Sequence, residues 1–579
     1  MTPTTGLNRR SEKIESLLSI KNLSVEFPTS EGTVRAVKNI SFDIPKGKTV
    51  GLVGESGSGK SVTCLAVMGI IPQNTGRVSA GEILFNGKNL LESKGQMRDI
   101  RGNRISMIFQ DPMTSLNPLM TVGRQVMEPL MLHKKMNKTE ARAETLELLK
   151  KVGMPQPDIK IDCYPHELSG GQIQRIMIAM ALSCEPDLLI ADEPTTALDV
   201  TIQKQILDLM LSLQKEYKMS ILFITHDLGV VADICEEVLV MYKGDLVEKN
   251  TTKNLFANAK HPYTKGLIAC RPDLEYNPSR LTTVQDYLDD NGNAIEPKIS
   301  SISIDDYKKE KHPDSDVILE LKNIKKYFPI RGGIFRRSVD WLKAVDDVSF
   351  KVKKGQTLGL VGESGCGKTT LGRTIVRLYE PTEGQVIFKG QDITNLSFKE
   401  LQPLRKKIQF IFQNPYASLN PRQTIGEIIT EPWKIHKTIE SPKDQYDEAA
   451  RLLDKVGLPP SHLSRYPHEF SGGQRQRICI ARALTLKPEL IICDESVSAL
   501  DVSIQASVLN LLLDLQEEFG LTYIFISHDL SVVKFISDEV GVMNEGKLVE
   551  FSDFKSVYER PKEAYTRKLL DSIPKGIPN

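Results

Sequence analysis

The sequence has no apolar stretch that approaches the roughly 18 residues needed for a membrane-spanning helix. Its first twenty residues are polar and charged, without the apolar core of a secretory signal. An excess of one charge is also missing, since 75 basic and 74 acidic residues leave a formal charge of +1. Nucleic-acid binders usually carry a basic excess. We therefore expect a cytoplasmic protein that reaches any membrane through partners and has no nucleic-acid partner.

Paired cysteines are absent as well. None of the eight cysteines lies in a CxxC motif, so the short ligand spacings of a zinc or iron–sulfur site are missing. Several lie inside apolar segments. We expect reduced cysteines that act as small core residues.

What the sequence does contain is an internal repeat. GLVGESGSGKS, IFQDPMTSLNP, YPHELSGGQIQR and LLIADEPTTALDV return in the second half as GLVGESGCGKT, IFQNPYASLNP, YPHEFSGGQRQR and LIICDESVSALDV. Ser169 and Ser471 are 302 residues apart, and so are His226 and His528. The repeat predicts two homologous domains, residues 1–270 and 316–579, joined by a polar linker at 271–315.

Each copy alternates short apolar runs with helical patterns, which favours an α/β domain with buried parallel strands. Between the IFQ and SGGQ segments we predict one clear helix per copy. In the first copy it is capped by Asn137 and ended by Gly153. In the second copy it is capped by Ser441, has Pro442 in its first turn and is ended by Gly457. These helices indicate a helical insert.

Both copies carry the phosphate-loop pattern GxxxxGK[ST] directly after an apolar run. The glycines let backbone N–H groups turn toward phosphate oxygens, and the following helix presents its positive end to the anion. Lys60 and Lys368 are expected to neutralise the phosphates, and Ser61 and Thr369 to offer a hydroxyl to Mg²⁺. The predicted loop residues are Gly54, Ser56, Gly57, Gly59, Lys60 and Ser61, and Gly362, Ser364, Gly365, Gly367, Lys368 and Thr369.

Two apolar runs, LLIADE and LIICDE, end in adjacent carboxylates. The first carboxylate of each pair, Asp192 or Asp494, suits the Mg²⁺ shell. The second, Glu193 or Glu495, suits polarising the water that attacks a phosphate.

With these motifs both copies resemble the ATP-binding cassette (ABC) family. Gln110 and Gln413 match its Q-loop, which adds a Mg²⁺ ligand, and His226 and His528 match its switch histidine. The resemblance assigns these four residues, with Glu193 and Glu495, to catalysis. The family's signature, which binds ATP, corresponds to Ser169, Gly171 and Gln172 in the first copy and to Ser471, Gly473 and Gln474 in the second.

The family resemblance also implies the fold and the assembly. Each copy is expected to have a P-loop, RecA-like α/β core, an antiparallel β subdomain and a helical insert. The two cassettes of one chain would pair head to tail, with ATP between the phosphate loop of one and the signature of the other. Neither copy lacks a catalytic residue type, so two hydrolytic sites are expected. An aromatic near the start of each domain would stack on adenine: Phe27 in the first copy, and Tyr327 or its neighbour Phe328 in the second.

One departure from the family is Ser496, which replaces the proline common after the catalytic glutamate. We expect it to alter the local turn without removing a catalytic group.

Within the family, the segments after the glutamines, the YPHE sequences and the tails HPYT and EAYT resemble the ATPases of dipeptide, oligopeptide and nickel importers. That branch implies two membrane permeases, docked near Gln110 and Gln413, an extracytoplasmic solute-binding protein, and a peripheral place on the cytoplasmic face of the inner membrane. Some members hold an iron–sulfur cluster after the first cassette. Only Cys270 lies there, so no cluster is expected.

The motifs leave the cargo open among short peptides, glutathione-like peptides, peptide antibiotics and a chelated metal. The alternative is a two-cassette ABC-F ATPase that acts on ribosomes. Its linker is a long charged helical pair, whereas residues 271–315 contain proline and Asn-Gly and lack helical periodicity.

Overall fold

The computed structural model describes residues 15–573, apart from 30–31, 73, 93–94, 96, 196–197, 273–277, 290–291, 298–315, 333–336 and 499. The chain divides into two compact units. The first unit comprises residues up to 196 together with 205–264, and the second unit comprises residues 197–204 and 265–573. The domain boundaries that the sequence suggests stay a prediction, since this division into units does not test them.

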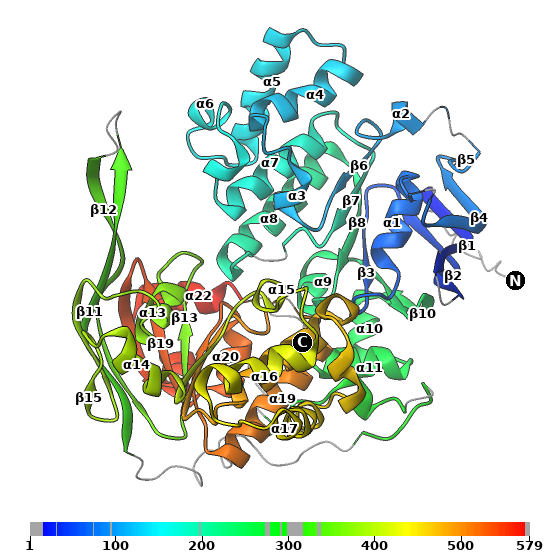
Figure 1. The fold of residues 1–579 in the computed structure, drawn as a ribbon. Coiled ribbons are helices and arrows are strands. Elements are labelled where there is room, and N and C mark those ends of the chain that lie inside the picture. Colours follow the sequence, from blue (N-terminus) through cyan, green and yellow to red (C-terminus); the bar gives the residue numbers. More distant parts are fainter. Residues whose placement is uncertain are drawn as a thin grey trace, which may run out of the picture. The chain divides into compact units, whose positions relative to one another are not determined.

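The first cassette contains two sheets (Figure 1). The four-stranded sheet is antiparallel, in the order β2-β1-β4-β5, with β1 (Ser16–Thr29), β2 (Gly32–Pro45), β4 (Arg77–Phe85) and β5 (Lys88–Asn89). The six-stranded sheet has the order β10-β9-β3-β8-β7-β6 and is parallel except for β10. Its strands are β3 (Thr49–Val53), β6 (Ile105–Ile108), β7 (Leu188–Asp192), β8 (Ser220–Thr225), β9 (Glu237–Tyr242) and β10 (Asp245–Thr251).

Every residue of β3, β7 and β8 is buried, as expected for parallel strands that are covered on both faces. Their apolar side chains join those of α1 (Lys60–Met68) and the antiparallel sheet in one core. The core therefore fixes the carboxyl ends of β3 and β7, which are the places where the phosphate loop and the paired carboxylates begin.

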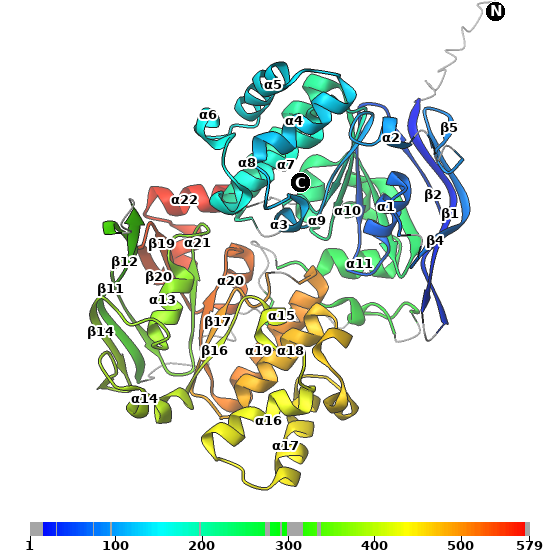
Figure 2. The same cartoon turned by 45° about the horizontal axis from the view of Figure 1, so that its top comes forward.

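The helical insert of the first cassette consists of α4 (Val122–His133), α5 (Lys138–Lys151) and α6 (Pro157–Lys160), and it packs on α7 (Gly170–Leu182). Figures 1 and 2 show α4, α5 and α6 together, beyond the edge of the six-stranded sheet. The predicted capping of α5 is confirmed: the Asn137 side chain accepts from two backbone N–H groups, and the Glu140 carboxylate accepts from Asn137 N.

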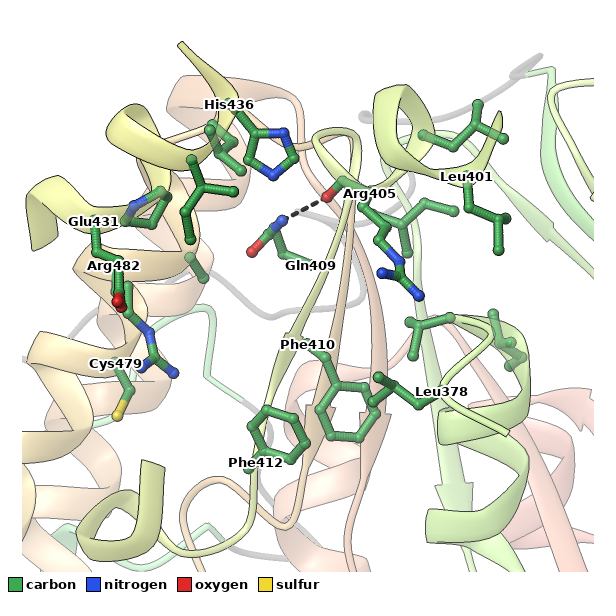
Figure 3. Close-up of a pocket in the computed structure, with 18 of the residues that line it drawn as sticks. Leu378, Leu401, Arg405, Gln409, Phe410, Phe412, Glu431, His436, Cys479 and Arg482 are labelled. Carbon is green, nitrogen blue, oxygen red and sulfur yellow. Dashed lines mark hydrogen bonds between the residues drawn. The ribbon is translucent and has the colours of Figure 1, made fainter. Parts of the chain in front are cut away.

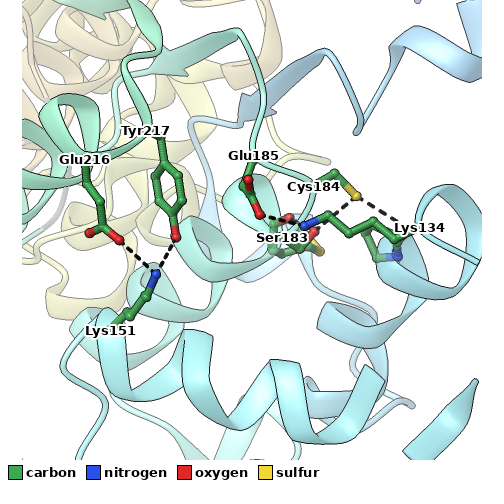
Figure 4. A network of polar contacts seen from close by, with 9 residues as sticks. Lys134, Lys151, Ser183, Cys184, Glu185, Glu216 and Tyr217 are labelled. Atoms are coloured by element: carbon green, nitrogen blue, oxygen red, sulfur yellow. Dashed lines mark hydrogen bonds and ion pairs between the residues drawn. The ribbon is translucent and has the colours of Figure 1, made fainter. Parts of the chain in front are cut away.

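Polar contacts tie the insert to α8 (Val200–Tyr217) (Figure 4). Lys151 Nζ lies 2.9 Å from Glu216 Oε1 and donates to Tyr217 Oη at 3.0 Å. These two bonds raise the pKa of the Lys151 ammonium above its ordinary value. On the neighbouring helix α7, Arg175 donates to the Val152 carbonyl and to Gln205 Oε1. An ion pair thus joins the insert to α8, and hydrogen bonds join the signature helix to both.

The second cassette repeats this architecture. Its antiparallel sheet has the order β12-β11-β14-β15, and its mainly parallel sheet has the order β16-β17-β18-β13-β19-β20. The strands are β11 (Val317–Gly332), β12 (Arg337–Lys353), β13 (Thr357–Val361), β14 (Glu383–Phe388), β15 (Gln391–Asp392), β16 (Ile408–Ile411), β17 (Leu490–Asp494), β18 (Thr522–Ile526), β19 (Glu539–Asn544) and β20 (Lys547–Asp553).

Its helical insert comprises α16 (Ile425–His436) and α17 (Pro442–Lys455), packed on α18 (Gly472–Leu484). Ser441 caps α17 by accepting from Asp444 N, and Pro442 occupies the first turn, as predicted. Arg477 of α18 donates to the Val456 carbonyl and to Ser507 Oγ of α19 (Val502–Phe519).

The remaining helices of the first cassette lie between and after these elements. They are α2 (Met97–Ile100), α3 (Pro112–Ser115), α9 (Leu228–Ile234), α10 (Thr252–Asn258) and α11 (Pro262–Ala269). Their counterparts in the second cassette are α13 (Lys368–Ile375), α14 (Phe398–Arg405), α15 (Pro415–Ser418), α20 (Leu530–Ile536), α21 (Phe554–Glu559) and α22 (Ala564–Asp571), where α13 corresponds to α1.

Part of the predicted linker is ordered against the second cassette. Leu281 N donates to Asn510 Oδ1 at 3.0 Å, and Asn510 Nδ2 donates to Leu281 O at 2.8 Å. Arg280 makes two contacts with the Asp514 carboxylate, at 3.0 and 3.3 Å. Both partners on the cassette belong to α19, so this stretch is seated on that helix rather than forming a helical pair of its own.

The expected fold class is confirmed: two tandem cassettes, each with an α/β core, an antiparallel β subdomain and a helical insert. All eight cysteines are free thiols; seven are buried and Cys163 is half-buried. Within the described ranges, no helix is both long and apolar enough to cross a membrane.

Candidate active site

The phosphate loop of each cassette connects a buried strand to a helix: β3 to α1 in the first, β13 to α13 in the second. The last loop glycine is the N-cap of the helix in both, with φ of 104° at Gly59 and 109° at Gly367. A Cβ on Gly59 would lie 2.5 Å from the Ala36 carbonyl oxygen, and one on Gly367 would lie 2.1 Å from that of Ala344. Only glycine fits this left-handed and crowded position, so the backbone N–H groups can face an anion.

The loop lysines are buried and fold back over the loop. Lys60 Nζ donates to the Gly54 and Glu55 carbonyls at 2.6 and 2.9 Å. Lys368 Nζ makes the same two bonds, to Gly362 at 2.7 Å and to Glu363 at 2.9 Å. Both ammonium groups are therefore held in the mouth of the loop, at the amino end of a helix.

The hydroxyl that follows each lysine faces the first carboxylate of the adjacent strand. Ser61 Oγ donates to Asp192 Oδ1 at 3.2 Å, and Thr369 Oγ1 donates to Asp494 Oδ1 at 2.7 Å. Burial raises the pKa of both aspartates above the ordinary range, and the charge of the neighbouring glutamate adds to this, while the hydroxyl hydrogen bond opposes it. The structure thus brings together residues that the sequence places more than 120 positions apart.

The second carboxylate of each pair has an uncommon backbone conformation. Glu193 and Glu495 have φ of 48° and 46°, in the left-handed region that non-glycine residues seldom adopt. Each is held there by a hydrogen bond of 2.9 Å from its N–H, to the carbonyl of Ile224 or of Ile526. The turn directs the carboxylate away from the strand, toward the glutamine and histidine described next.

Three predicted catalytic residues meet in each cassette. Gln110 Nε2 donates to Glu193 Oε2 at 3.1 Å, and His226 Nδ1 lies 3.3 Å from Glu193 Oε1. In the second cassette Gln413 Nε2 donates to Glu495 Oε2 at 2.7 Å.

His528 Nδ1 lies 3.6 Å from Glu495 Oε2, which completes the same group. Burial alone would raise the pKa of Glu495, but His528, Lys368 and Gln413 together bring that pKa below its usual value. The geometry thus keeps this carboxylate charged at neutral pH.

The effect of Ser496 on the turn that follows the glutamate stays a prediction, and no catalytic group is lost. The glutamates before Pro194 and Ser496 differ by only 2° in φ and donate to equivalent carbonyls over the same distance. The glutamate thus reaches the same φ and makes the same hydrogen bond to β8 or β18 with serine after it as with proline.

The signature residues lie at the exposed amino ends of α7 and α18. Ser169 and Ser471 are the N-caps: each hydroxyl accepts from the N–H of Gln172 or Gln474, and that glutamine accepts from the N–H of the serine. The first N–H groups of a helix have no partner inside it and attract anions. Each signature is thus built to receive an anion from outside its own helix.

The adenine-stacking candidates are not equivalent in the two cassettes. In the antiparallel sheets Phe27 pairs with Val34, whereas Tyr327 pairs with Lys343 and Phe328 with Leu342. Lys343 corresponds to Arg35, the partner of Glu26, so Tyr327 occupies the position of Glu26. The Tyr327 hydroxyl also donates to the Asp346 carboxylate. The counterpart of Phe27 is therefore Phe328, and Phe328 replaces Tyr327 as the candidate.

A pocket of about 340 Å³ opens in the second cassette between the core and the helical insert (Figure 3). Phe410 and Phe412 of the segment leading to Gln413 line it, opposite His436 and Arg482. Its lining is mainly apolar, and one lining residue, Phe412, immediately precedes the glutamine that contacts Glu495.

One contact of the phosphate loop was missed by sequence reasoning. The tyrosines of the HPYT and EAYT tails, Tyr263 and Tyr565, accept hydrogen bonds from the loop N–H groups of Glu55 and Glu363. The tails were noticed only as a family resemblance, although their recurrence at the same offset as the signature was a signal of a shared role.

Known proteins resemble the chain over nearly its whole length. Residues 37–196 and 345–498 match the family described as "ABC transporter", and residues 247–293 and 549–578 match the "Oligopeptide/dipeptide transporter, C-terminal region". The glutathione import ATP-binding protein GsiA of Escherichia coli strain K12 is 48% identical over 577 residues, which cover 97% of this chain and 90% of that protein.

The GsiA protein of Salmonella choleraesuis is also 48% identical, over 98% of this chain and 92% of its own length. Among solved structures, the dimeric ATP-binding cassette MJ0796 bound to ADP and Pi is 29% identical and matches 41% of this chain and 99% of its own, with a TM-score of 0.38. Nothing in these comparisons supports the ABC-F alternative. The chain therefore belongs to the ABC transporter family, as an ATP-binding ATPase with two cassettes and the C-terminal region of the oligopeptide and dipeptide transporters.

Proposed function

We propose that this ATPase hydrolyses ATP at two sites and drives the import of short peptides of the glutathione class. The observation that carries the proposal is that each cassette holds a full set of catalytic groups around one glutamate. The 48% identity to glutathione import proteins over 97% of the chain supports the class of cargo.

In the proposed reaction Glu193 and Glu495 accept a proton from the water that attacks the γ-phosphate, while the bond between that phosphate and the bridging oxygen breaks and ADP leaves. His226 and His528 orient these carboxylates, and Gln110 or Gln413 is placed to position the water. The developing charge on the phosphate is stabilised by loop N–H groups and by Lys60 or Lys368, which are already in place before the reaction.

The residues beside the loop fit a magnesium ion. Ser61 with Asp192, and Thr369 with Asp494, supply the hydroxyl and carboxylate oxygens that Mg²⁺ prefers. Asp494 Oδ2 is buried and has no hydrogen-bond partner among the described residues, so this oxygen is available as a ligand. Gln110 and Gln413 are the proposed additional ligands. When bound, the ion would neutralise charge on the β- and γ-phosphates.

We further propose that each ATP is shared between the phosphate loop of one cassette and the signature of the other. One site would combine Lys60 with Ser471, Gly473 and Gln474, and the other would combine Lys368 with Ser169, Gly171 and Gln172. The exposed amino ends of α7 and α18 support this, since each can receive an anion that its own cassette does not supply. Phe27 and Phe328 are the proposed adenine contacts.

The proposed partners are two membrane permeases fed by an extracytoplasmic solute-binding protein, which would place the chain on the cytoplasmic face of the inner membrane. The pocket beside Phe410 and Phe412 has the apolar lining expected for a docked permease helix (Figure 3). A helix bound there would lie next to Gln413, and so next to the carboxylate that the reaction uses.

The proposal is tested by affinity purification of the Glu193→Gln, Glu495→Gln chain from its native cells, with ATP and Mg²⁺. We expect recovery of two polytopic membrane proteins and a solute-binding protein. That binding protein is then titrated with glutathione, with a dipeptide and with a nickel chelate. Preference for glutathione supports the proposed cargo. Preference for another solute contradicts the proposed cargo but not the proposed transport function. Recovery of ribosomal proteins instead would overturn the transport function.

A further inference from the structure

The phosphate loop of the first cassette is held from outside by a tyrosine of the C-terminal region. The Glu55 N–H donates to Tyr263 Oη at 2.9 Å. Tyr263, on α11, is fully buried, and its ring stacks on Tyr242 of β9 with centroids 4.2 Å apart. A ring fixed in this way presents its hydroxyl at a constant place.

The second cassette makes the same contact, but its tyrosine has different neighbouring residues. The Glu363 N–H donates to Tyr565 Oη at 3.0 Å, and burial raises the pKa of that phenol. Tyr565, on α22, is half-buried. β19 ends at Asn544 where β9 ends at Tyr242, so the stacking partner is not repeated. The hydrogen bond, not the stacking, is the feature that both copies keep.

A glutamate, half-buried in the first cassette and buried in the second, fixes the helix that presents each tyrosine. Glu248 accepts from the N–H groups of Lys260 and His261 at 2.9 and 3.0 Å, just before α11. Glu550 accepts from Lys562 N at 2.9 Å and from Glu563 N at 3.3 Å, just before α22. The last strand of each sheet is thereby joined to the helix start, and the tyrosine position follows from the core.

The tyrosine bond acts on the same residue as the loop lysine. The carbonyl of Glu55 accepts from Lys60 Nζ at 2.9 Å, while its N–H is held by Tyr263. The carbonyl of Glu363 accepts from Lys368 Nζ at 2.9 Å in the same manner. Each tyrosine therefore fixes the residue against which the lysine ammonium rests.

We propose that Tyr263 and Tyr565 are positioning residues for ATP: through the second residue of each phosphate loop, they set the place of the loop and of its lysine. The C-terminal region of this branch thus forms part of the nucleotide site. This inference rests on the proposed use of the loop lysines. The tyrosines should affect ATP binding more than the chemical step, because they touch the loop and not the reacting atoms.

The test compares the full chain with its Tyr263→Phe, Tyr565→Phe double variant, which loses two oxygens and keeps both rings. Losing one neutral hydrogen bond per site is expected to raise the KM for ATP about three- to tenfold and to leave kcat within about twofold. Tyr558→Phe is the matched control, since the Tyr558 hydroxyl donates to the Leu530 carbonyl, away from the loop. Its KM should not change.

Thermal unfolding without nucleotide shows whether a change in KM comes from lost stability rather than from a displaced loop. If the double variant does not fold, the KM of each single variant is measured instead. An unchanged KM in the double variant, or an equal rise in Tyr558→Phe, would overturn the inference while ATP hydrolysis by the unaltered chain still stands. If the unaltered chain hydrolyses no ATP, the proposed function fails. The dissociation constant of ATP for the same variants then decides the tyrosine role by itself.

Discussion

In the first cassette Gln110 and Glu193 are joined across 3.1 Å, and in the second Gln413 and Glu495 are joined across 2.7 Å. The glutamates share their φ to within 2° and donate to equivalent carbonyls. The atoms that would face a nucleotide are thus repeated closely, although the glutamine lies nearer the glutamate in the second cassette and the histidine lies nearer it in the first.

The two cassettes differ more in the side chains that pack behind these catalytic groups. The second signature helix has Arg475 where the first has Ile173, and both side chains are buried. Arg475 Nε donates to the Pro467 carbonyl at 2.7 Å, and its guanidinium lies 3.8 Å from the centre of the Tyr416 ring. The comparison teaches that the repeat conserves the catalytic groups while each cassette supports them with its own packing.

The largest effect is expected from removing the proposed base of both cassettes. Glu193→Gln with Glu495→Gln should lower the ATPase rate by about 100- to 10,000-fold, because an amide cannot accept the proton from water. Steady-state phosphate release measures this. Glu185→Gln, in an exposed ion pair with Lys134, is the control.

The two single glutamate variants sharpen the comparison between cassettes. If both sites hydrolyse ATP, Glu193→Gln and Glu495→Gln should each lower the rate. Full activity in either single variant would show that its cassette does not contribute, and full activity in the double variant would refute the role of these residues.

The next largest effect is expected from giving the second cassette the residue of the first. Arg475→Ile removes the 2.7 Å hydrogen bond to the Pro467 carbonyl, which keeps only the longer bond from Phe470 N, and it removes the contact with Tyr416. We therefore expect a loss of about 2 kcal/mol of unfolding free energy. Denaturant unfolding measures it, with the exposed Arg451→Ile as the control. Unchanged stability would mean that isoleucine fits both signature helices equally well.

A smaller difference is expected at the caps of the inserts. Asn137→Ala should destabilise α5 by about 1 kcal/mol, because Asn137 accepts from two N–H groups and belongs to a capping box. Ser441→Ala should cost α17 about 0.5 kcal/mol, since Ser441 accepts from one N–H at 3.3 Å. Hydrogen exchange of the two helices compares the losses, and equal losses would contradict this ranking.

The smallest effect is expected inside the phosphate loop, where Cys366 corresponds to Ser58. Burial raises the pKa of the Cys366 thiol, although Lys368, 3.6 Å away, opposes this, so the thiol stays protonated at neutral pH. Cys366→Ser should therefore change the KM for ATP by less than about twofold, because it is a conservative change that keeps the bonds of Lys368 to the Gly362 and Glu363 carbonyls. A tenfold change would show that the two loops are not interchangeable.

The local features of this protein follow from the sequence. The phosphate loops, the apolar strands that end in Asp-Glu, and the capped helices at Asn137 and Ser441 each depend on residues near one another in the chain. Such patterns report backbone conformation directly, so the fold class and the candidate catalytic residues could be predicted from them. The repeat added to this by showing each pattern twice.

Tertiary structure decided what the chain brings together from a distance. Strand pairing showed that Phe328, not Tyr327, corresponds to Phe27, because a shift of one residue along a strand turns the side chain to the other face. The bond from Glu55 to Tyr263 spans 208 residues, and no local pattern encodes it. The sequence by itself determined which groups are present in each cassette; only the folded core, by fixing strand ends and helix starts, determined which of them touch.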